Sequence, residues 1–191
     1  MAIKVTVSRK GNGLNTLAGK VHKRVTAKIG FMNNPEMVKR AERNEYGWVQ
    51  QVTNKQSWFF KQNFGIEVKP HSVLSSPPRP FMRYTLRDYG DTWKAELAKG
   101  LEKNGLNELF SVMLGVASLA QSHVQETINR GGTPKTVFER RSELTMKINR
   151  IRAGTTASGN KRKVESSGNL LRSRALMDTG EMKNAVSYEV S

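Results

Sequence analysis

The segment from Leu106 to Ile128 constrains the fold more than any other part of the chain. Its apolar residues recur at spacings of three and four, which places them on one face of an α-helix. They are Leu106, Leu109, Phe110, Met113, Ala117, Ala120, Val124 and Ile128. Gly131 and Gly132 follow and predict the end of this helix.

A second long helix is predicted just before it, from Pro80 to about Lys103. The proline-rich segment 76–80 is predicted to be an extended connector, because each proline removes an amide donor and disfavours helix at the preceding residue. An imperfect apolar stripe then follows, consisting of Phe81, Tyr84, Leu86, Trp93, Leu97 and Leu101. Gly105 predicts the end of the helix.

Alternating apolar residues predict three strands near the ends of the chain. The alternating sets are Ile3, Val5 and Val7; Val25, Ala27, Ile29 and Phe31; and Val186, Tyr188 and Val190. A short helix is predicted from Pro35 to about Tyr46, with Asn34 as its N-cap and Gly47 closing it.

These elements predict an α+β fold in which a small antiparallel or mixed β-sheet packs against two long α-helices. The length of 191 residues suits one domain, residues 1–191. No stretch approaches about 18 consecutive apolar residues, and the N-terminus alternates, so we expect a protein without a membrane segment or signal peptide.

The region from Gly131 to Met177 has a different character. It contains eleven basic and three acidic residues, so it carries half of the formal net charge of +16. Its central part is polar and rich in Gly and Ser, a composition that buries too little apolar surface to order the chain. We therefore expect residues 131–177 to form a long, basic, partly flexible loop, with a short helix starting at the D-x-x-E spacing of Asp178 and Glu181.

The sequence disfavours an enzyme. It contains no cysteine, which excludes a thiolate nucleophile and disulfides and indicates a reducing compartment. The three histidines, His22, His71 and His123, lie far apart without ligand-spaced partners, and no metalloprotease or P-loop motif occurs. The triplet that starts at Asp178 has the letters of an aspartic protease loop, but helix capping explains its acid. We expect no cofactor, no metal and no catalytic residues.

The positive charge favours an anionic partner without identifying it. Five cations of the basic region are candidate contacts with DNA or with an acidic protein, namely Arg150, Arg152, Lys161, Arg162 and Lys163. No nucleic-acid reader motif accompanies them. Of these two partners, the acidic protein is favoured. The sequence also allows an alternative function, that of a small basic nucleic-acid-binding module.

Ten of the fourteen aromatic residues lie between Tyr46 and Trp93, which indicates a packed or contact-making region. Most of them are expected to be core residues. Trp58, Phe59, Phe60 and Phe64 lie on the stretch QSWFFKQNFG, which reads as a loop, and we expect them to be interface anchors.

Four landmarks in order carry a resemblance to a known family. They are Ile29-Gly30-Phe31, then Asn44-Glu45-Tyr46-Gly47, then Pro77-Pro78-Arg79-Pro80-Phe81-Met82-Arg83, and finally Leu176-Met177-Asp178-Thr179-Gly180 followed by Val186 to Val190. This series resembles the neck or tail-completion (virion morphogenesis, minor tail) proteins of tailed bacteriophages. It departs from their pattern in the aromatic stretch 56–65 and in the basic segment 131–176.

The resemblance implies a structural virion protein at the head-to-tail junction, made in the host cytoplasm and assembled as a homo-oligomeric ring, six- or twelve-fold. Its neighbours would be the head-completion or portal-adaptor protein and the tail terminator, with non-specific contact to DNA in the channel as an alternative role of the basic loop. Because a ring interface joins two different patches, we expect one patch to consist of Trp58, Phe59, Phe60, Phe64, Arg79, Phe81 and Arg83.

Overall fold

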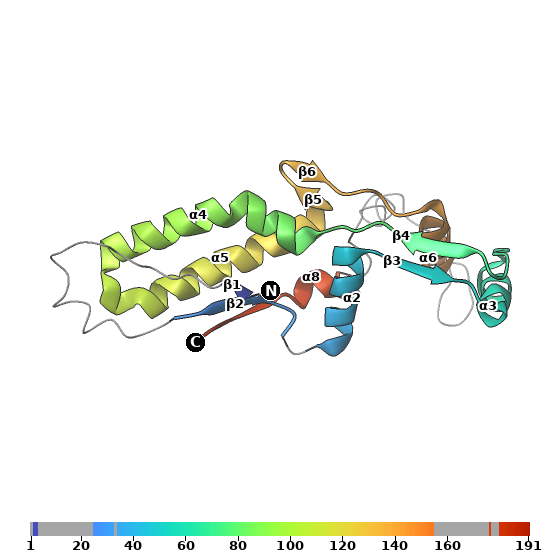
Figure 1. Ribbon diagram of the computed structural model, residues 1–191, viewed down its shortest axis with the longest axis horizontal. Helices are drawn as coiled ribbons and strands as arrows, with labels where there is room; N and C mark the ends of the chain where they lie inside the picture. The colour runs from blue at the N-terminus through green and yellow to red at the C-terminus, as the bar shows by residue number, and fades with distance from the viewer. Residues whose placement is uncertain (1, 4–24, 33, 155–175, 177–179) are drawn as a thin grey trace.

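The computed structural model describes residues 2–3, 25–32, 34–154, 176 and 180–191. Within them the chain combines long helices with small antiparallel sheets, as the predicted α+β class requires. The molecule is elongated (Figure 1), with the two long helices at one end and a smaller helix and strand pair at the other.

The two long helices form an antiparallel hairpin (Figure 1). Helix α4 spans Phe81–Asn104 and helix α5 spans Leu109–Arg130, and the 3-10 turn η1, Leu106–Glu108, joins them. The predicted helices and their glycine ends are confirmed. Gly131 ends α5 in the left-handed conformation, with φ 72°, and its N–H donates to the carbonyl of Thr127 at 3.0 Å.

A three-stranded antiparallel sheet lies against this hairpin. Its strands are β1 (Ala2–Ile3), β2 (Ala27–Gly30) and β7 (Ser187–Val190), in the order β1-β2-β7, with Ile29 opposite Tyr188. Helix α5 contacts β2 and β7, while α4 packs mainly on α5. The prediction of two helices on one sheet is therefore confirmed for α5, whereas α4 forms a further layer.

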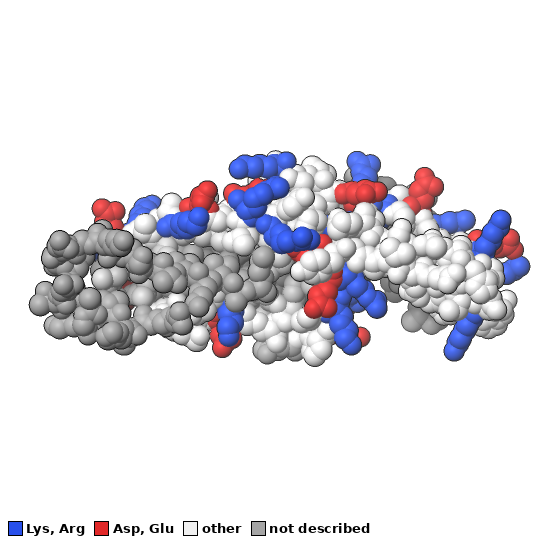
Figure 2. All heavy atoms as spheres, viewed as in Figure 1, with Lys and Arg blue, Asp and Glu red and all other residues white. Residues whose placement is uncertain are grey.

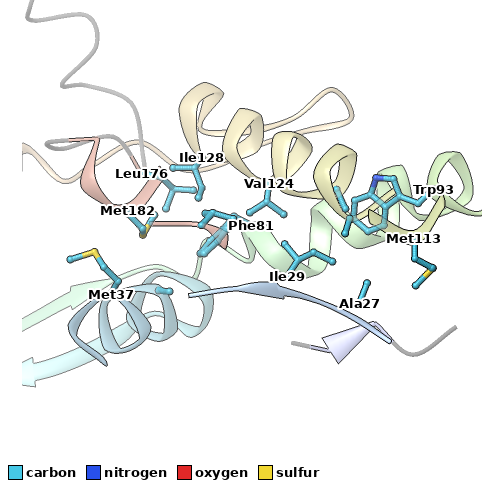
Figure 3. Close-up of a cluster of buried hydrophobic side chains, with 14 of the residues drawn as sticks. Ala27, Ile29, Met37, Phe81, Trp93, Met113, Val124, Ile128, Leu176 and Met182 are labelled. Atoms are coloured by element: carbon cyan, nitrogen blue, oxygen red, sulfur yellow. The ribbon is translucent and has the colours of Figure 1, made fainter. Parts of the chain in front are cut away.

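The hydrophobic core lies between α4, α5 and the sheet (Figure 3). Phe81 and Ile128 are fully buried, and Ile29 reaches the same cluster from β2. Helix α2, Pro35–Tyr46, covers the edge of the core with Met37 and Ala41. It begins as predicted, because the side chain of Asn34 accepts a hydrogen bond from the N–H of Met37 at 3.1 Å.

Residues 48–76 form an arm that extends away from the core (Figure 1). The arm consists of strand β3 (Trp48–Gln51), helix α3 (Asn54–Phe64) and strand β4 (Val73–Ser76), and the two strands pair antiparallel. The prediction that the aromatic stretch is a loop is wrong. A capping box of Thr53 and Gln56 starts α3, and Gly65, with φ 60°, ends it.

The predicted basic loop is wrong for its first part. Residues 131–154 contain the short strands β5 (Gly132–Thr133) and β6 (Thr136–Val137) and the helix α6 (Glu143–Gly154). The β5–β6 hairpin is attached to helix α4, because the hydroxyl of Thr133 donates a hydrogen bond to the buried carboxylate of Asp88. The rest of the predicted loop, residues 155–175, lies outside the described residues.

The C-terminal elements agree with the predicted order. Helix α8 spans Glu181–Asn184 and leads into β7. Gly180 is its N-cap and supplies no side-chain hydrogen bond. Asp178, the residue predicted to cap this helix, lies outside the described residues.

Candidate assembly surfaces

The first candidate feature is a junction where α2 meets the start of α4. Pro80 is the N-cap residue of helix α4, and its side chain cannot accept a hydrogen bond from the helix. The buried carboxylate of Glu45 on α2 takes that role, accepting hydrogen bonds from the N–H groups of Met82 (3.0 Å) and Arg83 (3.2 Å).

Arg83 completes this contact from its side chain. Its Nε donates to the Glu45 carboxylate at 2.9 Å and its Nη2 to the Glu45 carbonyl at 3.1 Å. The guanidinium also lies 5.0 Å from the centre of the Tyr46 ring, within range of a cation–π interaction. The segments N-E-Y-G and P-P-R-P-F-M-R, some 35 residues apart, are therefore bonded to each other.

Arg79 ties the proline-rich connector to the segment after β6. It is 4% exposed and donates to the carbonyls of Glu139 (2.9 Å) and Arg140 (3.1 Å) and to the hydroxyl of Ser76 (2.9 Å). Burial lowers the pKa of Arg79, and the charge of the nearby Arg141 lowers it further. A fixed guanidinium fork with three oxygen partners suits a structural clamp.

The structure therefore changes the roles predicted for part of the interface set. Phe81 is fully buried and meets Phe31 edge to face, with ring centres 6.2 Å apart. Arg79 is also buried, and Arg83 is engaged with Glu45. Phe81 and Arg79 therefore pack within the subunit, whereas the Arg83 side chain is 48% exposed and its contact with a neighbouring subunit stays a prediction.

The C-terminal landmark reaches the same junction. Leu176 and Met182 are buried in the core cluster next to α2 (Figure 3). Arg40 of α2 pairs with Glu181 of α8 at 3.0 Å. Helices α2 and α8, which adjoin the second and the last landmark, are thus joined by a contact between residues 141 positions apart in the chain.

Helix α3 carries the remaining aromatic residues of the predicted interface. Trp58 is 63% and Phe59 47% exposed, whereas Phe60 and Phe64 are half-buried. The Phe59 and Phe64 rings meet edge to face at 5.8 Å. Trp58 and Phe59 are therefore the two aromatic members of the set that are exposed to solvent.

One face of the β3–β4 pair is also exposed and partly apolar. Val49 lies opposite Ser75, and Gln51 lies opposite Val73, so these four side chains share one face of the pair. Val49 is 75% and Val73 63% exposed. The opposite face, with Leu74, turns towards α6.

Two apolar residues of the periodic segment that predicted α5 are exposed on the surface. Leu106 and Phe110 were assigned to its buried stripe, yet they are 48% and 49% exposed at the turn between α4 and α5. Leu106 lies in the turn η1 and Phe110 in the first turn of α5, ahead of Met113, the first residue of this helix that is buried. Residues from Met113 onward keep the predicted burial.

The predicted basic contacts are only partly described. Arg150 and Arg152 belong to α6, of which the backbone alone is described at those positions. Lys161, Arg162 and Lys163 lie outside the described residues. On the face shown in Figure 2, lysines and arginines are spread along the length of the molecule with acidic residues among them.

A cavity of about 410 Å³ lies between α2, the β3–β4 pair, α6 and Met182. Arg40 and Arg79 are among its lining residues. Both guanidinium groups already have oxygen partners, Arg40 in Glu181 and Arg79 in two carbonyls and a hydroxyl. We therefore assign this cavity no ligand.

Neither a cluster of metal ligands nor a membrane-spanning helix is found in the described part of the chain. Within it, no group of three or more His, Asp or Glu side chains is placed to hold a metal ion. None of the helices described is both long enough and apolar enough to cross a membrane. That the protein is not an enzyme stays a prediction from the sequence.

Comparison with known proteins adds no relative. No protein-family model, no curated protein and no solved structure matches this chain significantly. The resemblance of its motifs and the geometry of the chain itself carry the functional argument.

Proposed function

We propose that this protein is a structural component of a tailed-bacteriophage virion, assembling as a ring at the head-to-tail junction. The observation that carries the proposal is the contact between the motifs of the resemblance. Glu45 of N-E-Y-G caps the helix that begins in P-P-R-P-F-M-R, and the segment around Leu176 and Met182 packs beside them.

This contact gives the motifs a common physical purpose. A cap that comes from another helix works only if both partners are present, because an unpaired buried carboxylate or helix N-terminus costs free energy. The landmarks thus contribute to one set of contacts that holds α2, α4 and α8 together. Motifs that share a set of contacts support a family resemblance better than the same number of independent short motifs.

The remaining features suit a protein that works by contact. The arm carries exposed aromatic and β-branched side chains at one end of an elongated molecule, and the turn between the long helices exposes two more at the other end. Large exposed apolar side chains that gather in patches are typical of interaction sites.

The test is the mass of the purified protein by light scattering, with negative-stain electron microscopy of any oligomer. A closed ring, six- or twelve-fold, is the expected result. The measurement is repeated with duplex DNA at low and moderate salt. A monomer that binds DNA tightly, with a log-log salt slope of about −0.9 per phosphate contact, would instead favour the nucleic-acid-binding module.

A further inference from the structure

Two exposed patches of opposite character lie at opposite ends of the molecule. The α3 patch consists of Lys55, Trp58 and Phe59, at the tip of the arm. The turn patch consists of Glu102, Leu106, Glu108 and Phe110, where α4 passes into α5. Figure 1 shows α3 at one end of the long axis and the α4–α5 turn at the other.

The α3 patch combines apolar area with positive charge. Trp58 and Phe59 lie three and four residues after Lys55, so the three side chains share one face of the helix. Lys61 also lies on α3 and pairs with Glu67 at 2.9 Å. At this end of the molecule residues other than Lys, Arg, Asp and Glu form most of the visible surface, with basic side chains and acidic ones at its edge (Figure 2).

The turn patch combines apolar area with negative charge. Leu106 and Phe110 are four residues apart and each is about half exposed. Glu102 precedes this pair and Glu108 lies between its members in the chain; both glutamates are exposed, as are two lysines, Lys99 and Lys103.

We propose that the α3 patch of one copy binds the turn patch of the next copy. The inference rests on the proposed ring and names the two surfaces that form its subunit contact. Each patch offers apolar surface on the order of 200 Å², and Lys55 of the α3 patch is opposite in charge to Glu102 and Glu108 of the turn patch. The patches differ, so the contact is heterologous, as closure of a ring requires.

An association of like patches would be disfavoured. Two α3 patches would place Lys55 against Lys55, and two turn patches would place Glu108 against its own equivalent, both repulsive arrangements. Pairing the unlike patches brings Lys55 towards Glu108 and covers Trp58 and Phe110 together. The two patches then form the apolar centre of a larger contact, because a stable interface buries about 800 Å² on each partner.

The chain has no cysteine, so introduced thiols provide an unambiguous test. Gln62→Cys places a thiol on the exposed face of α3, four residues after Trp58, and Asn107→Cys places one between Leu106 and Glu108. Both substitutions leave the charges and the apolar side chains of the patches in place. Equal amounts of the two variants are mixed and treated with a short bismaleimide.

The expected product is a covalent dimer of Q62C with N107C. A chain carrying both cysteines should give a ladder of multimers. Val137→Cys is the matched control, because Val137 is 86% exposed on β6, outside both patches. We expect Q62C to react with N107C at least tenfold faster than with V137C.

Trp58→Ala, combined with Q62C, separates contact from accessibility. It should lower the rate of reaction with N107C at least tenfold and leave the thermal midpoint unchanged, because Trp58 is mostly exposed. Equal rates with N107C and V137C would overturn the pairing. If light scattering of the unmodified chain still showed a ring, the proposed function would stand without it; a monomer with no selective cross-link would remove both.

Discussion

Glu45 provides the sharpest test of the junction. Glu45→Ala removes the acceptor for two N–H groups at the start of α4 and the partner of the Arg83 side chain. Loss of a helix cap costs about 0.5–2 kcal/mol, and a hydrogen bond to a charged group contributes about 1.5–3 kcal/mol. Arg83 is half exposed, which screens its share, so we expect a total loss of about 2–4 kcal/mol.

The assay is equilibrium unfolding in urea, with the thermal midpoint as a second measurement. For a chain of this size the expected loss lowers the midpoint by roughly 5–12 °C. The matched control is Glu42→Ala, an exposed glutamate on the same helix, which should change stability by less than about 0.5 kcal/mol. The reasoning is refuted if the two variants unfold at the same urea concentration.

Three further outcomes follow from the core and its caps. Phe81→Ala, which empties a fully buried site, should cost about 3–5 kcal/mol in urea unfolding; a loss below 1 kcal/mol would contradict its core placement. Gly47→Ala should be more destabilising than Gly65→Ala, since both have positive φ but only at Gly47 would a Cβ lie 2.7 Å from a carbonyl oxygen; equal losses would count against that close approach. Burial lowers the pKa of His123, whose Nδ1 accepts a hydrogen bond from the Trp93 indole. The free energy of unfolding should therefore be highest above pH 6.5 and fall as the pH drops through the lowered pKa. In urea unfolding at several pH values, His123→Gln should make the free energy of unfolding less dependent on pH.

Local signals were sufficient wherever an element is defined by its own residues. Helix α2 has its cap in Asn34 and its stop in Gly47, and α4 has its stop in Gly105. The alternation of apolar residues predicted the strands β2 and β7, and their pairing with each other is a finding of the structure. These features depend on spacing and caps alone, which a single sequence displays.

Helix α3 was missed although its caps were visible. Thr53 and Gln56 have the capping-box spacing and Gly65 follows at the right distance, but the run of aromatic residues forms no single apolar stripe. Helix α6 was missed for a related reason, because its charge and the polar segment after it outweighed the spacing of Leu144, Ile148 and Ile151. In both segments the amino-acid composition is untypical of a helix, although capping residues or apolar spacing indicate one.

The capping of α4 by Glu45 could not have been predicted from the chain. No local pattern pairs a residue near the end of one helix with amides 37 residues later, since the contact exists only once α2 and α4 have packed. Likewise, no local pattern shows that Arg79 and Phe81, which were predicted to contact another subunit, are buried within this one. Motif residues indicate that a position is constrained, and only the packed structure tells whether the constraint lies inside the subunit or outside it.

The buried motif residues hold the fold together, whereas the exposed residues of α3 are available for contact with another copy. The junction of Glu45, Arg79 and Arg83 lies where the arm leaves the core, and Gly47 at its base cannot accept a side chain. The base of the arm is therefore attached to the core at this junction. If the α3 patch binds the next copy, the angle between successive subunits depends on this junction, and a ring closes only when that angle is the same at every contact. Buried motif residues would then set the geometry of the assembly without touching the neighbouring subunit.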